Sequence, residues 1–229
     1  MTSFLFDEFD VAMSVSSVWK TLTRRKWSRK KASKKALERC EELRYLWKGR
    51  SCWWSVDRLV FIDESAFNER TGSRKYGWSM KGVVCEDFEK VKRSERWSVL
   101  PAMTVNGYLP DPLIYQGSIN GSLFYAWIRE GVLPHLEIGS ILVMDNASIH
   151  RSIELRTLVE DAGMVLEFLP PYSPDYNPIE ESFAVIKQWI RRNRDLAECF
   201  SDFGVFVRYA VEQVGGKHAR RQFEHAGYK

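Results

Sequence analysis

The sequence predicts an α/β protein in which a mixed sheet is flanked by helices and preceded by a short helical segment. The chain has 229 residues and is 45% hydrophobic, which is enough for one large domain with a substantial core. In its middle, an antiparallel strand pattern gives way to alternating strands and helices, the order typical of parallel strands. The segment before about residue 50 is basic and lacks this pattern.

Positive charge is concentrated near the start of the chain. Residues 14–50 contain thirteen Lys or Arg against three Glu, a net charge of +10, whereas the whole chain carries +4. A basic arm before a mildly acidic body favours polyanionic partners. A solvated helix face would explain the same run, and composition leaves both interpretations open.

The cysteines and the chain start exclude several classes of protein. The cysteines form no CxxC pair and match no histidine spacing, so we expect neither a disulfide framework nor structural zinc. No stretch approaches the ~18 apolar residues of a membrane span, and the first ten residues lack a basic start followed by an apolar run. We expect a soluble protein from a reducing compartment, with no membrane partner and no small-molecule organic cofactor.

Two short helices are expected before the basic run. Thr2 to Asp10 has one apolar side, and a second helix can be capped by Ser14 or Ser16. The pair fits a helix-turn-helix, although many small helical pairs look alike. Ser28 to Lys48 is expected to be a helix or an extended linker outside the core.

The composition changes after this segment, and we place the domain boundary there, between a segment of residues 1–50 and a domain of residues 51–229. The boundary lies within Gly49 to Trp54.

Beyond the boundary, buried and alternating runs predict a series of strands and helices. Strands are expected at Arg58–Asp63, Lys75–Met80, Trp97–Val105, Leu113–Gln116, Ser140–Asp145 and Met164–Leu169. Helices are expected at Ser122–Leu133, Ile153–Ala162, Asn177–Arg192 and Phe203–Val214. An antiparallel meander followed by parallel β-α units in one mixed sheet is the order of an RNase H-like fold, although other α/β layouts fit as well.

Three acidic residues stand where the chain leaves a buried element. Asp63 and Asp145 end strands, and Glu180 lies in the first turn of the helix after Pro178. Strand ends and nearby helix starts converge on one edge of an α/β sheet. Carboxylates gathered there resist ionisation unless cations lie among them, and oxygen ligands select Mg²⁺ or Mn²⁺.

Each acid also has a structural explanation. Asp63 and Asp145 can start turns, and Glu180 can complete a capping box with Asn177. Glu64 follows Asp63 in an extended chain and should point to the opposite face. Glu181 is rotated by about 100° from Glu180 around the helix, so only one acid of each pair should enter a site.

Four segments of the sequence carry a family resemblance: FIDESAF at Phe61–Phe67, YGW at Tyr76–Trp78 with Gly82 after it, VMDNASIH at Val143–His150 and LPPYSPDYNPIEE at Leu169–Glu181. They resemble the DDE/D superfamily of transposases, specifically its Tc1/mariner and IS630-like branch. The last segment is highly specific, and the 34 residues between Asp145 and Glu180 are the interval characteristic of this branch.

The resemblance implies metal-dependent cleavage of DNA phosphodiesters followed by strand transfer. It assigns Asp63, Asp145 and Glu180 as catalytic metal ligands for two ions of Mg²⁺ or Mn²⁺, with Asp63 bridging both ions. Asn146 and His150 would contact the scissile phosphate or a metal-bound water. Alternatively, Asn146 shapes the turn and His150 caps the next helix. Tyr172 and Ser173 would border a DNA channel.

The resemblance also covers the start of the chain. Ser14 to Lys31 is similar to the last DNA-reading helix of the family and its basic linker. Six side chains would bind DNA phosphates without reading bases: Arg24, Arg25, Lys26, Arg29, Lys30 and Lys31. Relatives carry further DNA-binding helices before this point, so the resemblance implies an N-terminally truncated transposase.

Double-stranded DNA is thus the expected partner, and a homodimer is expected by analogy with the family. Two other functions stay open. One is a catalytically silent or domesticated DNA-binding remnant of a transposase, and the other is an RNase H-type nuclease without strand transfer. The expected location is the nucleus in a eukaryote and the cytoplasm otherwise.

Overall fold

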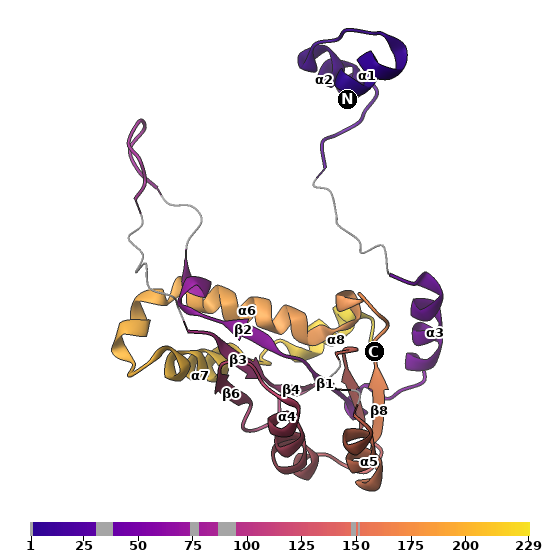
Figure 1. Ribbon diagram of the computed structural model, residues 1–229, viewed down its shortest axis with the longest axis vertical. Coiled ribbons are helices and arrows are strands. Elements are labelled where there is room, and N and C mark those ends of the chain that lie inside the picture. Colours follow the sequence, from indigo (N-terminus) through magenta and orange to yellow (C-terminus); the bar gives the residue numbers. More distant parts are fainter. Residues whose placement is uncertain (1, 31–38, 74–77, 87–94, 148–149, 151) are drawn as a thin grey trace. The chain divides into compact units, whose positions relative to one another are not determined.

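The structure is a computed structural model that describes residues 2–30, 39–73, 78–86, 95–147, 150 and 152–229. The chain divides into two compact units, Met1–Leu37 and Glu38–Lys229, and Figure 1 labels the elements of each. No helix within the described ranges is long and apolar enough to cross a bilayer. All four cysteines are described, and all are free.

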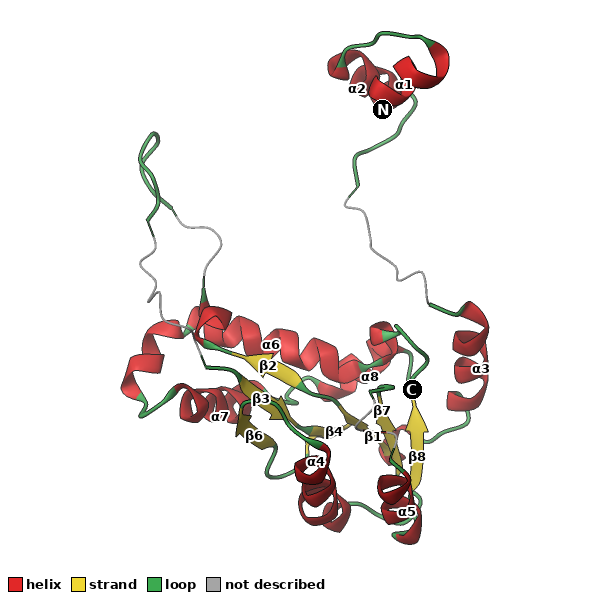
Figure 2. Cartoon of the chain, viewed as in Figure 1, coloured by secondary structure: helices red, strands yellow, loops and turns green. Residues whose placement is uncertain are grey.

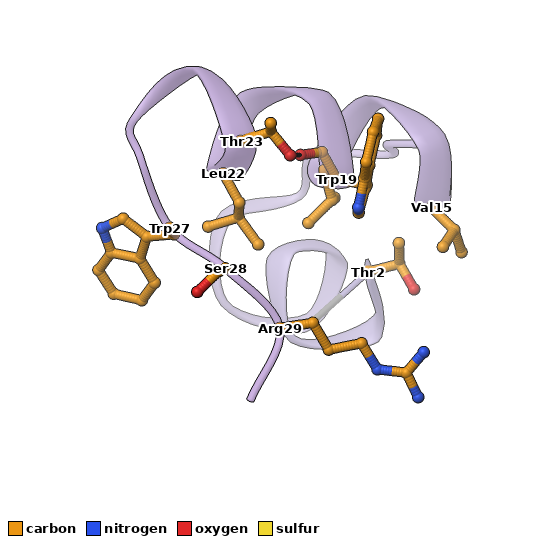
Figure 3. A pocket seen from close by; sticks show the side chains of 9 residues that line it. Thr2, Val15, Trp19, Leu22, Thr23, Trp27, Ser28 and Arg29 are labelled. Carbon is orange, nitrogen blue, oxygen red and sulfur yellow. Dashed lines mark hydrogen bonds between the residues drawn. The ribbon is translucent and has the colours of Figure 1, made fainter. Parts of the chain in front are cut away.

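The first unit contains the two short expected helices, α1 (Thr2–Phe9) and α2 (Val15–Arg24). Of the two candidate caps, Ser14 is the one used, because its side chain accepts a hydrogen bond from the Ser17 amide at 3.2 Å. Helix α2 has no buried residue, and Trp19 remains 62% exposed. Trp19 and Trp27 line an open pocket of about 430 Å³ beside α2 (Figure 3). The two helices therefore leave apolar surface uncovered.

The second unit begins with α3 (Glu41–Ser51), so the helical alternative expected for this part of the chain is the one found. The expectation that it lies outside the core is wrong for residues 41–48, whereas residues 31–38 lie outside the described residues. Trp47 is only 2% exposed and belongs to the main hydrophobic cluster. Its indole packs edge to face on Trp54 with ring centroids 5.2 Å apart. The boundary between the units lies before α3. The sequence did not indicate that Trp47 belongs to the core, because the residues around it are charged.

The strands of the second unit form two sheets, drawn as arrows in Figure 2. The five-stranded sheet has the order β5-β4-β1-β7-β8, with β1, β7 and β8 parallel and β4 antiparallel to β1. Its strands are β1 (Leu59–Ile62), β4 (Ala102–Thr104), β5 (Gly107–Tyr108), β7 (Ile141–Met144) and β8 (Val165–Phe168). The antiparallel three-stranded sheet has the order β2-β3-β6 and contains β2 (Ser65–Phe67), β3 (Trp97–Leu100) and β6 (Leu113–Gln116).

Two strand predictions differ from this arrangement. The single strand expected at Trp97–Val105 is divided at Pro101 into β3 and β4, which belong to different sheets. Proline has no amide hydrogen for the ladder and interrupts a strand. The strand expected at Lys75–Met80 lies partly outside the described residues, and its described part, residues 78–80, is not a strand. The mixed sheet and the RNase H-like order of elements are confirmed.

Both faces of β1, a central strand of the five-stranded sheet, are buried, and this burial fixes the position of its end. Along β1, Leu59 and Phe61 enter the hydrophobic cluster shared with α6 (Pro178–Arg192), α7 (Phe203–Val214) and α8 (Ala219–Ala226). Val60 and Ile62 enter the opposite cluster, shared with α4 (Gly121–Trp127) and α5 (Ile153–Asp161). A strand covered on both faces reads as a continuous apolar run, and Leu-Val-Phe-Ile is such a run.

The predicted helices are present, with one interruption and one addition. The helix expected at Ser122–Leu133 ends as α4 at Trp127 and continues as a π-helical turn, η3 (Ile128–Val132). Helix α8 was not predicted. The described residues also contain the short helical turns η1 (Val56–Arg58), η2 (Glu69–Gly72), η4 (Leu133–His135), η6 (Pro174–Tyr176) and η7 (Arg194–Cys199).

Candidate active site

The three candidate carboxylates line one pocket. Asp63 directly follows β1 and Asp145 directly follows β7, and these parallel strands are neighbours, so both side chains leave the same edge of the sheet. Glu180 reaches the same place from the first turn of α6. The pocket has a volume of about 510 Å³, and its wall is the segment Leu169–Pro174 with Asn177. Residues 117 positions apart in the sequence thus meet at one site.

Asp63 is the most perturbed of the acids. Burial first, and then the nearby charges of Glu180 and Asp145, together raise the pKa of its carboxyl from 3.8 to about 7. The backbone amide of Glu64, which donates to Asp63 Oδ1 at 2.7 Å, opposes this shift only in part. Such a carboxylate needs compensating positive charge to remain ionised at neutral pH.

Asn177 supports Asp63 rather than the helix that it precedes. Its Nδ2 donates to Asp63 Oδ2 at 2.7 Å, and its side chain makes no capping hydrogen bond to α6. The capping box considered for Glu180 is therefore absent, and of its structural explanations only the favourable place of an acid in the first turn of a helix remains. The sequence analysis did not identify Asn177 as a residue of this site, because an asparagine before Pro-x-Glu has the pattern of an ordinary helix cap.

His150 supports Asp145 in a similar way. Its Nδ1 lies 2.7 Å from Asp145 Oδ1, and its ring packs against Phe124 with centroids 4.6 Å apart. The residue is 3% exposed, which keeps it from direct contact with a DNA phosphate. Ser152, not His150, caps α5 by accepting from the Leu155 amide. His150 therefore positions Asp145, a role that neither sequence-based alternative had included.

The other polar residues near these contacts are Asn146, Glu64 and Glu181. Asn146 Nδ2 donates to the Leu169 carbonyl at 2.6 Å, which ties the end of β7 to the end of β8 and supports its turn-shaping alternative. Glu64 points away from the pocket and accepts from Ser98 Oγ at 2.7 Å. Glu181 pairs with His225 at 3.2 Å. One acid of each adjacent pair enters the site, as predicted.

The donor set fits a hard divalent cation. Three carboxylates converge on a pocket in which one of them is buried and resists ionisation, and oxygen donors favour Mg²⁺ or Mn²⁺. Among the described residues, however, no three His, Cys, Asp or Glu side chains already stand in ligand geometry. Because Asp145 is half exposed and Glu180 is exposed, both can turn toward a cation.

The basic side chains proposed for DNA lie at the end of the first unit. Arg24 ends α2, and the residues that follow it are exposed through Lys30. Lys31 lies outside the described residues. In this part of the chain the pocket of Figure 3 is lined by apolar and hydroxyl side chains with Arg29 and contains no acid, so it is unlike the carboxylate pocket.

Comparison with known proteins identifies the family. The model of the family described as DDE superfamily endonuclease matches residues 58–202, which include all three carboxylates. The chain belongs to the DDE superfamily endonucleases. A second model, described as a winged helix-turn helix, matches residues 1–51. This family is the one that the motifs around Asp63, Asp145 and Glu180 resemble.

Solved structures share the fold of this family member at low sequence identity. The Mos1 mariner paired end complex with Mn has a TM-score of 0.69 and 17% identity, covering 98% of this chain and 73% of that chain. The Mos1 paired-end complex with the left transposon end gives 0.67 and 16%, with the same coverage. The Mos1 strand transfer complex gives 0.61 and 15%, covering 99% and 77%. No curated protein matches the chain.

Replacing His150 with phenylalanine is expected to reduce metal-dependent nicking by about 10- to 100-fold, the usual effect of losing a group that orients a metal ligand. Stability should change little, because the substitution also removes Nε2, which is buried and has no hydrogen-bond partner within the described part of the chain. His150→Asn, which restores a donor near the position of Nδ1, should recover part of the rate. The measurement is the nicking rate against Mn²⁺ concentration. A His150→Phe protein that matches the parent at every concentration would refute the positioning role.

Proposed function

We propose that this protein is a Tc1/mariner-like transposase that cleaves DNA phosphodiesters and transfers the resulting 3′ ends to a new strand. The observation that carries this proposal is the convergence of Asp63, Asp145 and Glu180 on one pocket at the edge of the parallel strands. Family membership makes cleavage of nucleic acid the reaction to expect. The shared fold with Mos1 complexes favours the transposase kind within that family.

The proposed cofactor is a pair of Mg²⁺ or Mn²⁺ ions. Related Mos1 structures are described as complexes with Mn and with Mg. When bound, such ions polarise the phosphate and stabilise the charge that develops on the attacking and leaving oxygens. Asp63 would contact both ions, Asp145 one of them and Glu180 the other.

The chain's own residues would prepare this site before the reaction. Asn177 holds Oδ2 of Asp63, and the backbone amide of Glu64 holds Oδ1. His150 would hold one oxygen of Asp145, Oδ1, through its Nδ1. Tyr172 and Ser173, which line the pocket beside the acids, would border the DNA.

Double-stranded DNA is the proposed substrate and partner. The exposed arm of Arg24, Arg25, Lys26, Arg29 and Lys30 would bind phosphates, and Lys31 would extend it. Because the similar Mos1 structures are paired-end complexes, we propose that two copies of this chain act on two DNA ends. A reaction on genomic DNA would require the protein to reach the genome, so we propose the nucleus of a eukaryotic host, and the cytoplasm otherwise, as its location.

A strand-transfer assay with pre-cut ends that carry a free 3′-hydroxyl tests this function. With Mg²⁺ or Mn²⁺ present, the protein should join these ends to target DNA, and Asp145→Asn should not. Nicking without joining would instead indicate an RNase H-type nuclease. DNA binding with neither reaction would indicate a DNA-binding remnant.

A further inference from the structure

The turn that leads into α6 delivers Asn177 to Asp63. Asn177 is 5% exposed, and its Oδ1 is buried without a hydrogen-bond partner among the described residues. The Asn177 side chain is therefore oriented by the hydrogen bond from its Nδ2 to Asp63, without a second hydrogen bond to its Oδ1 from the described residues. The direction of this side chain then depends on where the backbone of η6, directly before it, is held.

Helix α3 holds η6 through a bidentate ion pair between Arg44 and Asp175. Arg44 Nη1 donates to Asp175 Oδ1 at 3.0 Å, and Nη2 donates to Oδ2 at 2.6 Å. The guanidinium carbon also lies 3.9 Å from the centre of the Tyr176 ring. Although burial of Asp175 opposes its ionisation, the hydrogen bonds and charge of Arg44 outweigh this and lower the pKa of that carboxyl. Arg44 itself is 5% exposed.

The C-terminal segment also contacts this turn, through the backbone carbonyl of Tyr176. The Tyr228 hydroxyl donates to the Tyr176 carbonyl at 2.9 Å and accepts from Trp47 Nε1 at 3.1 Å. Both residues that precede Asn177 are thus fixed, Asp175 by its side chain and Tyr176 by its ring and its carbonyl. Arg44, Trp47 and Tyr228 all lie outside residues 58–202, the part matched by the endonuclease family model.

We propose that Arg44 is a positioning residue for the catalytic carboxylates: its bidentate pair with Asp175 fixes η6 so that Asn177 can hold Asp63. The inference rests on the proposed function, in which Asp63 is the central metal ligand. A displacement of about 1 Å at a reacting group costs up to about 100-fold in rate. Bidentate pairing sets both distance and angle, which a point charge cannot do.

The test compares Arg44→Met, Asn177→Ala and the double variant in the full chain. Two quantities are measured: the affinity for Mn²⁺ alone, from the electron paramagnetic resonance signal of the free ion, and the single-turnover nicking rate. Each single variant should weaken Mn²⁺ binding and slow nicking by about 10- to 100-fold. If Arg44 acts through Asn177, the double variant should be no worse than Asn177→Ala. Effects that multiply in the double variant would overturn the proposal.

Two further variants separate positioning from stability. Asp175→Asn removes the charge of a half-exposed partner and should leave the fold intact while reproducing the loss in Arg44→Met. Arg156 offers a control on α5, because it also pairs with a carboxylate, Glu160, and lies over an aromatic ring, Phe168, neither of which belongs to η6. Arg156→Met should bind Mn²⁺ and nick like the parent. A folded Asp175→Asn protein with parental Mn²⁺ affinity and rate would also overturn the proposal.

Failure of this inference is distinguishable from failure of the proposed function. If the parent nicks DNA, Asp145→Asn does not, and the Arg44 variants are unaffected, only the positioning role is wrong. If neither the parent nor any variant nicks, the proposed function fails. The Mn²⁺ affinities of the Arg44 and Asn177 variants would still decide whether Arg44 organises the carboxylates.

Discussion

Replacing Asp63 with asparagine is expected to abolish metal-dependent nicking and, at the same time, to stabilise the metal-free protein above neutral pH. Nicking should fall by about 10³-fold or more, equivalent to about 4 kcal/mol of transition-state stabilisation. The gain in stability follows from removing a carboxylate that burial, Glu180 and Asp145 all hinder from ionising. Opposite effects on activity and stability identify a residue kept for function rather than for folding.

The pH dependence of stability follows from the same carboxyl. In the unfolded chain Asp63 ionises near 3.8, whereas in the metal-free fold its pKa is about 7. Between these values the folded state binds more protons, so stability falls as pH rises through this window and becomes constant above it. The slope from this group is on the order of 1 kcal/mol per pH unit. Asp63→Asn should lose this slope, measured by urea unfolding at pH 5 to 8 without metal.

Divalent metal should offset the loss of stability that ionised Asp63 causes, and it should do so only in the parent protein. Mn²⁺ at about 100 times its dissociation constant would stabilise the parent by about 2.7 kcal/mol, and it should leave Asp63→Asn unchanged. Glu64→Gln is the matched control, because Glu64 is the next acid in the chain but contacts Ser98 and Arg96 instead of the pocket. Equal loss of nicking in both variants would mean that the pocket is not the site of the reaction.

Neutralising the basic arm is expected to flatten the salt dependence of DNA binding. Each phosphate contact contributes about −0.9 to the slope of log K against log salt concentration. Changing Arg24, Arg25, Lys26, Arg29 and Lys30 to glutamine should therefore reduce that slope by up to about 4.5 in magnitude. Fluorescence anisotropy with a duplex between 50 and 200 mM salt measures it.

The design of this experiment depends on the structure. Removing residues 1–50 would also delete most of α3 and the buried Trp47, so a deletion should end before Glu38. Arg220→Gln with Arg221→Gln, on α8, serves as a charge control that should leave the slope unchanged. If the five-residue variant keeps the parental slope, the arm does not contact DNA.

Much of the fold could be predicted because its sequence signals are local. The apolar run before Asp63, the similar run before Asp145 and the helix from Pro178 each report their own burial and period, and all are present. The division at Pro101 was missed because sheet membership depends on partners far away in the chain. The core role of α3 was missed because a helix with one buried tryptophan among charges looks solvent-exposed.

The sequence by itself determined which acids stand at the ends of buried elements and to which family their motifs are similar, since both are properties of contiguous residues. Only the tertiary structure decided how those acids are supported: Asn177 turns from its helix to Asp63, His150 to Asp145, and Arg44 reaches 131 positions along the chain to Asp175. A side chain with several possible hydrogen-bond partners is assigned one only when packing brings a particular partner within reach, and no local pattern contains that information.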